Sequence, residues 1–382
     1  MAIVGYPNAG KSQLLNALVG EKLAAVSRKR HTTRDGIMGV LSREDTQIVF
    51  CDTPGFMTDV GKDSISYDLS MSAKSYMAGV DYSLVVIDAA KTKLTPDYMN
   101  TISQLMWNAL FAQGEGTPYS AGGKEKSKFG IVLNKVDLVK PKSKLLDVAK
   151  TFGKMADQMI LERQKLLHHN SAQQQQQDQQ QDQQVLQIIP SEDILPEIFY
   201  TSAKQGQNDV GVQDVLSHLL DMSIEDREWL LPEAHMLTPM DYKARVEEII
   251  REKIYRRLHR EVPHQIRQHN RQLELIRGDG GEDKTDGDDA SDNEDNKNTN
   301  DLSSLGHNKT KGTSTSSTKN NNVILIHQDL LVRSKSHLNL LQKNSGMNLQ
   351  QIHDAAVPEL RLLFQCEVFL TLSAKLVSRN RR

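Results

Sequence analysis

Short apolar runs alternate with segments of helical periodicity through the first 220 or so residues, and a polar loop follows most of the runs. Runs of this length between polar loops are typical of buried strands. The runs lie at Ala2–Val4, Ile37–Leu41, Gln47–Cys51, Ser83–Asp88, Phe129–Leu133 and Glu197–Thr201. Because helical segments such as Gln13–Leu18 separate them, the pattern predicts an α/β domain with a parallel sheet.

A different pattern begins at Asp241, which is a predicted N-cap for an amphipathic helix. Apolar residues recur at helical spacing as far as Leu258, and the helix is expected to end before Pro263. Strands are expected at 264–276, Val323–Leu331 and Cys366–Leu376, with a helix at Leu349–Phe364. The second half of the chain therefore predicts a smaller α+β domain.

Low-complexity segments interrupt both predicted domains. Residues 113–128 are rich in Gly, Ser and Lys, residues 170–184 form a Gln tract, and residues 278–322 are acidic and then rich in Ser, Thr and Asn. Such segments bury little apolar surface, so we interpret them as insertions that are disordered or only loosely helical. The predicted organisation is a first domain over 1–222, a linker over 223–240 and a second domain over 241–382.

Composition narrows the environment of the protein. The net charge of −2 is the sum of an acidic run within 279–295 and basic stretches in the second half of the chain. The basic stretches are compatible with RNA binding. Cys51 and Cys366 are the two cysteines, and their apolar surroundings predict core positions in a reducing compartment rather than a disulfide. No run of about 18 apolar residues predicts a membrane span.

The first predicted strand begins at Met1, which leaves it shorter than a central strand of five or six residues. We therefore expect either a clipped strand or a missing N-terminal segment. The predicted compartment is the cytoplasm, or a mitochondrion or plastid if a targeting segment is missing.

The residues between the first strand and the first helix carry the pattern GxxxxGK[ST]. They are Gly5, Tyr6, Pro7, Asn8, Ala9, Gly10, Lys11 and Ser12, and Gln13 follows them. Glycines let backbone N–H groups point inward at phosphates, Lys11 reaches the outer phosphates, and the Ser12 hydroxyl is a magnesium ligand. The pattern predicts nucleotide binding.

A DxxG pattern follows at the end of the third predicted strand, about forty residues after Lys11. It consists of Asp52, Thr53, Pro54 and Gly55. Asp52 is expected to hold a magnesium-bound water, and the N–H of Gly55 is expected to meet the γ-phosphate. Thr33 is the predicted third magnesium ligand, ordered by the triphosphate and released on hydrolysis, with Thr32 as the competing choice.

The fifth apolar run leads into Asn134, Lys135, Val136 and Asp137. The Asp137 carboxylate accepts from both N1–H and the exocyclic amine of guanine, a donor pair that adenine lacks. Asn134 is expected to contact the base edge and the neighbouring loop, and the stem of Lys135 to pack on the base. Ser202, Ala203 and Lys204 supply a last predicted base-side loop. The nucleotide is therefore expected to be GTP.

With these motifs in place, the chain resembles the translation-factor-like GTPases, and among them the Era family of ribosome-assembly GTPases. GYPNAGKS, TTRD, DTPGF, NKVD and SAK match motif by motif, and VEEIIREKIYRRLHREVPH resembles the entry into that family's C-terminal domain. The resemblance implies a Ras-like P-loop GTPase domain followed by a type II KH-like domain. It also implies binding of small-subunit ribosomal RNA and the pre-ribosomal subunit.

Phe56 follows the DxxG pattern and has no amide to orient the attacking water, so intrinsic hydrolysis is expected to be slow. In relatives with a hydrophobic residue there, a phosphate-loop Asn helps to hold a potassium ion. Asn8 matches that Asn, so the resemblance implies potassium stimulation. The alternative is that Asn8 only shapes the turn.

The sequence departs from the family in two places. Gln13 replaces a residue with a short hydroxyl near the α-phosphate. The Gly-x-x-Gly turn that clamps RNA aligns with Lys343–Gly346, where only the second glycine is present. Basic residues that remain for phosphate contacts are Arg251, Arg256, Arg257, Arg333 and Lys335. The rival hypothesis is a GTP-dependent protein-interaction module whose KH-like domain no longer binds RNA.

Overall fold

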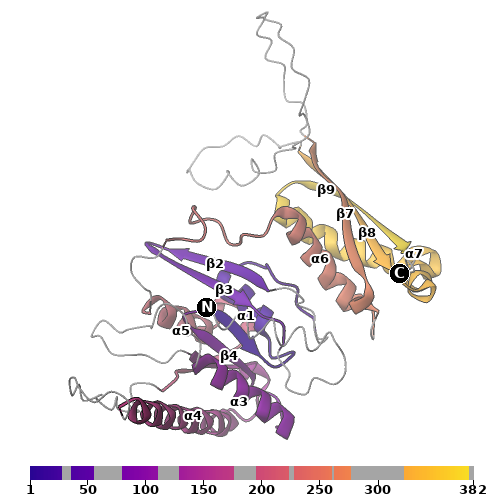
Figure 1. Ribbon diagram of the computed structural model, residues 1–382. Helices are drawn as coiled ribbons and strands as arrows, with labels where there is room; N and C mark the ends of the chain where they lie inside the picture. The colour runs from indigo at the N-terminus through magenta and orange to yellow at the C-terminus, as the bar shows by residue number, and fades with distance from the viewer. Residues whose placement is uncertain are drawn as a thin grey trace, which may run out of the picture. The chain divides into compact units, whose positions relative to one another are not determined.

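The computed structural model describes residues 1–27, 36–55, 80–110, 129–175, 195–222, 228–259, 262–276 and 322–377 (Figure 1). It divides into two compact units, residues 1–239 and 240–382, which we describe separately. The predicted insertion at 113–128 lies outside the described residues, as does the insertion at 278–322 apart from its last residue.

The first unit is built on a six-stranded sheet with the order β2-β3-β1-β4-β5-β6. Its strands are β1 (Ala2–Gly5), β2 (Ile37–Arg43), β3 (Thr46–Asp52), β4 (Ser83–Asp88), β5 (Phe129–Asn134) and β6 (Ile198–Thr201). A strand lies at each predicted run, which confirms the α/β prediction. The sheet is parallel except for β2, which pairs antiparallel with β3 at the edge.

Helices cover both faces of this sheet. They are α1 (Lys11–Val19), α3 (Pro96–Leu110), α4 (Lys144–Gln175) and α5 (Val210–Leu220). α3 and α4 lie beside each other (Figure 1) and bury Val85, Ile87 and Ile131 of the sheet. α4 continues through residues 170–175, so this part of the Gln tract is helical, which is one of the two states predicted for it. Residues 176–184 lie outside the described part.

The strand order places the site beyond the carboxyl ends of the parallel strands. β1 lies between β3 and β4, and the four parallel strands that follow or flank it all end on the same side. In open parallel sheets, ligands bind beyond the carboxyl ends of the strands where the order reverses. The predicted motifs follow β1, β3, β5 and β6, so they meet at that edge.

The two cysteines differ from their predicted placement. Cys51 and Cys366 are free thiols, and both are partly exposed rather than in the core. Burial raises the pKa of each thiol. In the part of the chain that the structure describes, no helix is long and apolar enough to cross a membrane.

Among its described residues, the second unit has a three-stranded sheet with the order β7-β8-β9, two α-helices and a 3-10 helix (Pro263–Gln265). Its elements are α6 (Tyr242–Arg257), β7 (Arg267–Ile276), β8 (Val323–Val332), α7 (Lys335–Phe364) and β9 (Glu367–Leu376). β8 pairs antiparallel with β7 and parallel with β9. Asp241 caps α6 as predicted, because its Oδ1 accepts from the Ala244 N–H at 2.7 Å.

One face of this sheet packs against both helices. Ile324, Ile326, Leu330 and Val332 alternate along β8 and are buried with apolar residues of α6 and α7. Alternation of this kind is what a half-covered sheet requires. The result is the smaller α+β unit expected from the sequence.

α7 begins at Lys335 instead of Leu349, so the predicted turn at Lys343–Gly346 is wrong as a separate loop. Gly346 nevertheless has φ of 84°, a left-handed value that glycine adopts without a Cβ penalty. One glycine with a non-helical backbone angle therefore lies within the helix at the end of the expected turn. Sequence reasoning missed the first turns of α7 because their polar residues obscure the apolar positions Leu338 and Leu341.

Candidate nucleotide site

The phosphate loop joins β1 to α1. Asn8 and Gly10 have φ of 64° and 100°, and Gly10 is the N-cap of α1. Left-handed residues alternating with ordinary ones turn successive N–H groups toward one side, which makes a concave anion site at a helix N-terminus. The predicted loop therefore has the backbone conformation that phosphates require.

Lys11 lies in the first turn of α1 and is buried, and its Nζ donates to the Tyr6 carbonyl at 3.4 Å. Burial lowers the pKa of Lys11, while the Asp52 carboxylate opposes that shift. Negative phosphates beside Lys11 would favour its charged form. Its position agrees with the predicted role at the outer phosphates.

The DxxG segment contacts the phosphate loop directly. The Ser12 Oγ donates to Asp52 Oδ2 at 2.5 Å, and Asp52 is fully buried at the end of β3. A Cβ on Gly55 would lie 2.9 Å from Pro7 Cγ, so only glycine fits there without movement. The structure thus brings together two predicted magnesium ligands, while Thr32, Thr33 and Phe56 lie outside the described residues.

Asn134 connects the phosphate loop to the base side. Its Nδ2 donates to the Ala9 carbonyl at 3.0 Å, and its Oδ1 accepts from Thr201 Oγ1 at 3.2 Å and from the Ala203 N–H at 3.1 Å. All three bonds are buried, where loss of one partner is costly. Asn134 therefore fixes the spacing between two loops that one nucleotide has to bridge.

Asp137 lies in a 3-10 helix (Val136–Leu138), and its Oδ1 accepts from Ser202 Oγ at 2.8 Å. The Ser202 N–H in turn donates to Asp209 Oδ1, and Asp209 caps α5. This chain of hydrogen bonds orients the carboxylate predicted to read guanine.

Three further predicted site residues are Gln13, which was expected near the α-phosphate, and Val136 and Lys204 on the base side. Gln13 Nε2 donates to the Ala203 carbonyl at 3.4 Å, which ties the departure at Gln13 to the base-side loop. Val136 is partly exposed and Lys204 is exposed.

Lys135 has φ of 64°, and its Nζ donates to the Asn8 carbonyl at 2.6 Å and to Asp88 Oδ2 at 2.7 Å. Asp88 and Thr201, which hold Lys135 and Asn134 in place, were missed as site residues. Each of the two is the last residue of a parallel strand. That position, next to the predicted motifs, was the feature of the sequence that could have identified them.

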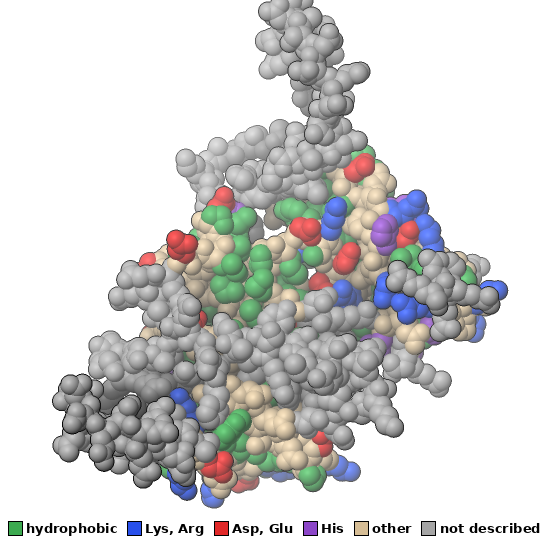
Figure 2. Space-filling model, in the orientation of Figure 1, with side chains coloured by type: hydrophobic (Ala, Val, Ile, Leu, Met, Phe, Trp, Pro, Cys, Tyr) green, Lys and Arg blue, Asp and Glu red, His purple; other side chains and the backbone are tan. Residues whose placement is uncertain are grey.

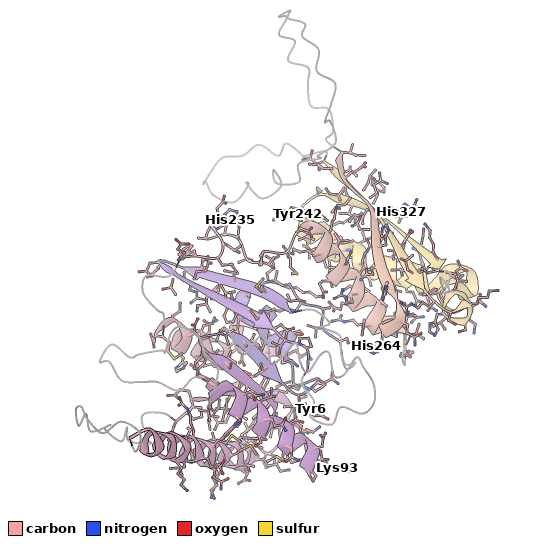
Figure 3. The ribbon with its side chains drawn as sticks, in the orientation of Figure 1. Tyr6, Lys93, His235, Tyr242, His264 and His327 are labelled. Carbon is pink, nitrogen blue, oxygen red and sulfur yellow. The ribbon has the colours of Figure 1, made fainter. Side chains whose placement is uncertain are left out.

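Tyr6 anchors the other side of the phosphate loop, beside the start of α3 (Figure 3). Its ring meets Tyr98 edge to face with centroids 5.0 Å apart, and Lys91 Nζ lies 5.1 Å and 4.7 Å from the centroids of the two rings. Such aromatic and cation–π contacts each contribute about 0.5–1.5 kcal/mol. The side chain of this loop residue is therefore fixed by α3.

Two of the basic residues predicted to contact RNA form ion pairs within the second unit. Arg251 pairs with Glu248, and Arg256 pairs with Glu252. Arg257 donates to Asn348 Oδ1 at 3.1 Å, close to Gly346. Arg333 and Lys335 are exposed. RNA contact by these residues stays a prediction.

Further cations lie on the sheet face opposite the helices. Arg271 and Lys375 flank the buried carboxylate of Asp329, with His327 close by. Figure 2 shows Lys, Arg and His side chains gathered on the visible face of this unit, and Figure 3 labels His327 there. This face offers positive charge that the sequence analysis did not single out.

Comparison with known proteins identifies the family. Residues 1–111 match the family described as 50S ribosome-binding GTPase. The GTPase Era of Trichlorobacter lovleyi is 31% identical over 264 residues, which cover 69% of this chain and 68% of that protein. The chain belongs to the Era family of GTPases. The chain is thus a GTP-hydrolysing enzyme.

Other Era proteins extend the comparison. The mitochondrial GTPase Era of Danio rerio is 39% identical over 150 residues, which cover 39% of this chain and 30% of that protein. A crystal structure of Era with MgGDPNP and nucleotides 1506–1542 of 16S ribosomal RNA has a TM-score of 0.64 at 23% identity, covering 99% of this chain and 93% of that one. This likeness shows that both units have the Era fold.

Proposed function

We propose that this Era-family GTPase is a slowly hydrolysing switch that binds small-subunit ribosomal RNA during ribosome assembly. The proposal rests on the hydrogen bonds of the Asn134 side chain, which contacts both Ala9 in the phosphate loop and Ala203 in the base-side loop. A ligand that spans both loops has phosphates at one end and a base at the other. Asp137 then makes guanine the preferred base.

Magnesium fits the oxygen atoms at the centre of the site. Ser12 Oγ and Asp52 Oδ2 are 2.5 Å apart, and Mg²⁺ prefers such oxygen ligands together with substrate phosphates. When bound, the ion would neutralise charge on the β- and γ-phosphates. We propose Ser12, Asp52 and Thr33 as its protein contacts, direct or through water.

Potassium stimulation through Asn8 is the first testable consequence. We expect wild-type GTP turnover to be at least about tenfold faster in KCl than in NaCl, because one charge contact made in the transition state contributes up to about 10²–10³-fold. Asn8→Ala should remove that difference. Turnover measured at equal ionic strength in the two salts tests this, with Lys150→Ala, an exposed change in α4 outside the nucleotide motifs, as the control. Equal wild-type turnover in both salts would contradict potassium stimulation.

RNA binding is assigned to the second unit. The order α6-β7-β8-α7-β9 and the left-handed Gly346 within α7 support a KH-like role, and the Era structure of the same fold was determined with 16S ribosomal RNA. Phosphate contacts would come from Arg257, Arg333 and Lys335.

Salt dependence of RNA affinity tests this assignment. For the full chain and a fragment of the 3′ end of small-subunit rRNA, we expect log K to fall linearly with log salt. Arg333→Gln and Lys335→Gln should each reduce the slope by roughly 0.7. Lys150→Gln, an exposed change in α4, should leave it unchanged. Absence of binding at low salt would favour the rival, a protein-docking module.

The compartment is a further proposal. Relatives include bacterial Era proteins and a mitochondrial form. We propose that this protein acts beside ribosomes, either in the cytoplasm or in an organelle. Imaging the product of the complete gene as a fluorescent fusion distinguishes these locations.

A further inference from the structure

Tyr6 occupies the second position of the phosphate loop, and its backbone and side chain contact different partners. Its carbonyl accepts from Lys11 Nζ at 3.4 Å and from the Ala9 N–H at 3.1 Å. The motif GxxxxGK[ST] specifies no residue type at this position, so it does not account for the buried ring of Tyr6. The Tyr6 carbonyl helps to set the position of the ammonium that is predicted to reach the outer phosphates.

The ring of Tyr6 belongs to a cluster of three side chains, Tyr6, Lys91 and Tyr98, which we call the brace. The centroids of the two rings lie 5.0 Å apart, and Lys91 Nζ lies 5.1 Å from the Tyr6 centroid and 4.7 Å from the Tyr98 centroid. The ammonium lies over both rings, whose negative faces attract a cation. Because Tyr98 is buried, one side of the ammonium is shielded from water, which strengthens this attraction.

The surrounding backbone holds both partners of Tyr6. The Lys91 N–H donates to the carbonyl of Asp88, the last residue of β4, at 3.2 Å. The Tyr98 N–H donates to Thr95 Oγ1 at 3.3 Å at the start of α3, and the Tyr98 ring packs in the core of the first unit. Burial raises the pKa of Tyr98, so its ring stays a neutral phenol. The brace therefore connects the phosphate loop to the sheet and to α3.

The turn that carries Lys91 also holds the other limb of the phosphate loop. Asp88 Oδ2 accepts from Lys135 Nζ at 2.7 Å, and Lys135 Nζ also donates to the Asn8 carbonyl at 2.6 Å. The phosphate loop is thus tied to this turn at two points, the ring of Tyr6 and the carbonyl of Asn8. Loss of either tie gives the loop backbone more freedom beside the phosphates.

We propose that Lys91 and Tyr98 are positioning residues for GTP hydrolysis. They act through Tyr6, whose carbonyl orients Lys11 Nζ toward the outer phosphates. The lysine of a phosphate loop contacts the β- and γ-phosphates, so the brace affects a bound triphosphate more than a bound diphosphate. The proposal rests on GTP binding in the first unit and does not depend on RNA. It gives a role in the reaction to two residues outside the nucleotide motifs.

Substitution of Lys91 in the full chain tests the proposal. Lys91→Met keeps an unbranched stem and removes the charge. We expect kcat at saturating GTP to fall at least about threefold, because two cation–π contacts are lost. For the same reason, the affinity for a non-hydrolysable GTP analogue should fall at least about threefold more than the affinity for GDP. Lys91→Arg restores a cation that stacks on aromatic faces and should return both values to within about twofold of wild type.

Lys93→Met is the matched control, because Lys93 is an exposed lysine of the same loop (Figure 3). It should leave kcat and both affinities unchanged. The second partner is tested in the same way: Tyr98→Phe keeps the ring and should resemble wild type, whereas Tyr98→Leu should reproduce the losses of Lys91→Met. Thermal unfolding of each variant shows whether the fold is retained.

The affinity of the wild type for GDP is measured first, which shows separately whether the first unit binds guanine nucleotide. Equal losses of affinity for the GTP analogue and for GDP in Lys91→Met would indicate a general loosening of the fold and would overturn the proposal. A wild-type kcat in Lys91→Met, or a failure of Lys91→Arg to restore kcat, would overturn it as well.

Discussion

Asp137→Asn should weaken GTP binding by about 10²–10⁴-fold, because it removes two hydrogen bonds to a charged acceptor and places an amide N–H near the guanine donors. Ser202, which donates to Asp137 Oδ1 at 2.8 Å, keeps the replaced side chain in the same place. An asparagine there can accept from N1–H and donate to a carbonyl at position 2. The variant should therefore bind xanthosine triphosphate more tightly than GTP.

Competition for a fluorescent GDP analogue measures both affinities. Asp147→Asn makes the same chemical change at an exposed position in α4 and should leave the preference for GTP intact. GTP affinity within about threefold of wild type in Asp137→Asn would mean that Asp137 does not read the base, since even one lost charged hydrogen bond costs about 1.5–3 kcal/mol.

Gly10→Ala should abolish measurable nucleotide binding while the protein stays folded. Gly10 has φ of 100°, and an added Cβ would clash with Nδ2 of Asn134, the atom that holds Ala9. Holding an alanine in this left-handed backbone conformation alone costs roughly 1–2 kcal/mol. Displacing Asn134 also breaks its buried bonds to Thr201 and Ala203, so the phosphate loop and the base-side loop lose their fixed spacing.

Alanine substitutions at two other glycines separate the cost of the backbone conformation from the cost of the clash with Asn134. Gly206 has φ of 67°, ψ of −147° and open space around it, so Gly206→Ala imposes a backbone cost without a clash. That cost is larger than at Gly10, whose φ of 100° and ψ of 25° are left-handed, and it therefore sets an upper bound on the backbone cost there. Gly153 lies in α4, where a Cβ would make ordinary contact with Ile198, so Gly153→Ala should stabilise the fold by about 0.5–1 kcal/mol. Thermal unfolding and GDP affinity are measured for all three. Retained GDP affinity in Gly10→Ala would contradict the proposed role of Asn134 as the connection between loops.

The sequence was enough to predict which motifs lie together where each motif follows the end of a strand. Asp52 and Asn134 end buried strands, and parallel strands end together, so motif order was enough to bring distant residues to one edge. Asp88 ends a strand in the same way but belongs to no motif. Its pairing with Lys135 depends on the left-handed backbone of Lys135, which sequence patterns do not encode.

Features set by tertiary contacts were less predictable. β2 reads as an ordinary apolar run, and its antiparallel position at the edge follows only from its short connection to β3. The segment 223–240 was predicted only as a linker, yet Leu231 is buried and hydrogen-bonded to Gln47. The early start of α7 was hidden by polar residues, and Gly346 supplies the break expected from a loop.

The proposed switch has one central consequence: we propose that guanine nucleotide in the first unit controls RNA binding by the second. The most direct test is the affinity of the full chain for a fragment of the 3′ end of small-subunit rRNA, measured at one salt concentration with GDP and with a non-hydrolysable GTP analogue. We predict binding at least about fivefold tighter with the GTP analogue, the lower end of typical coupling between sites. Equal affinity in the two nucleotide states would contradict the account.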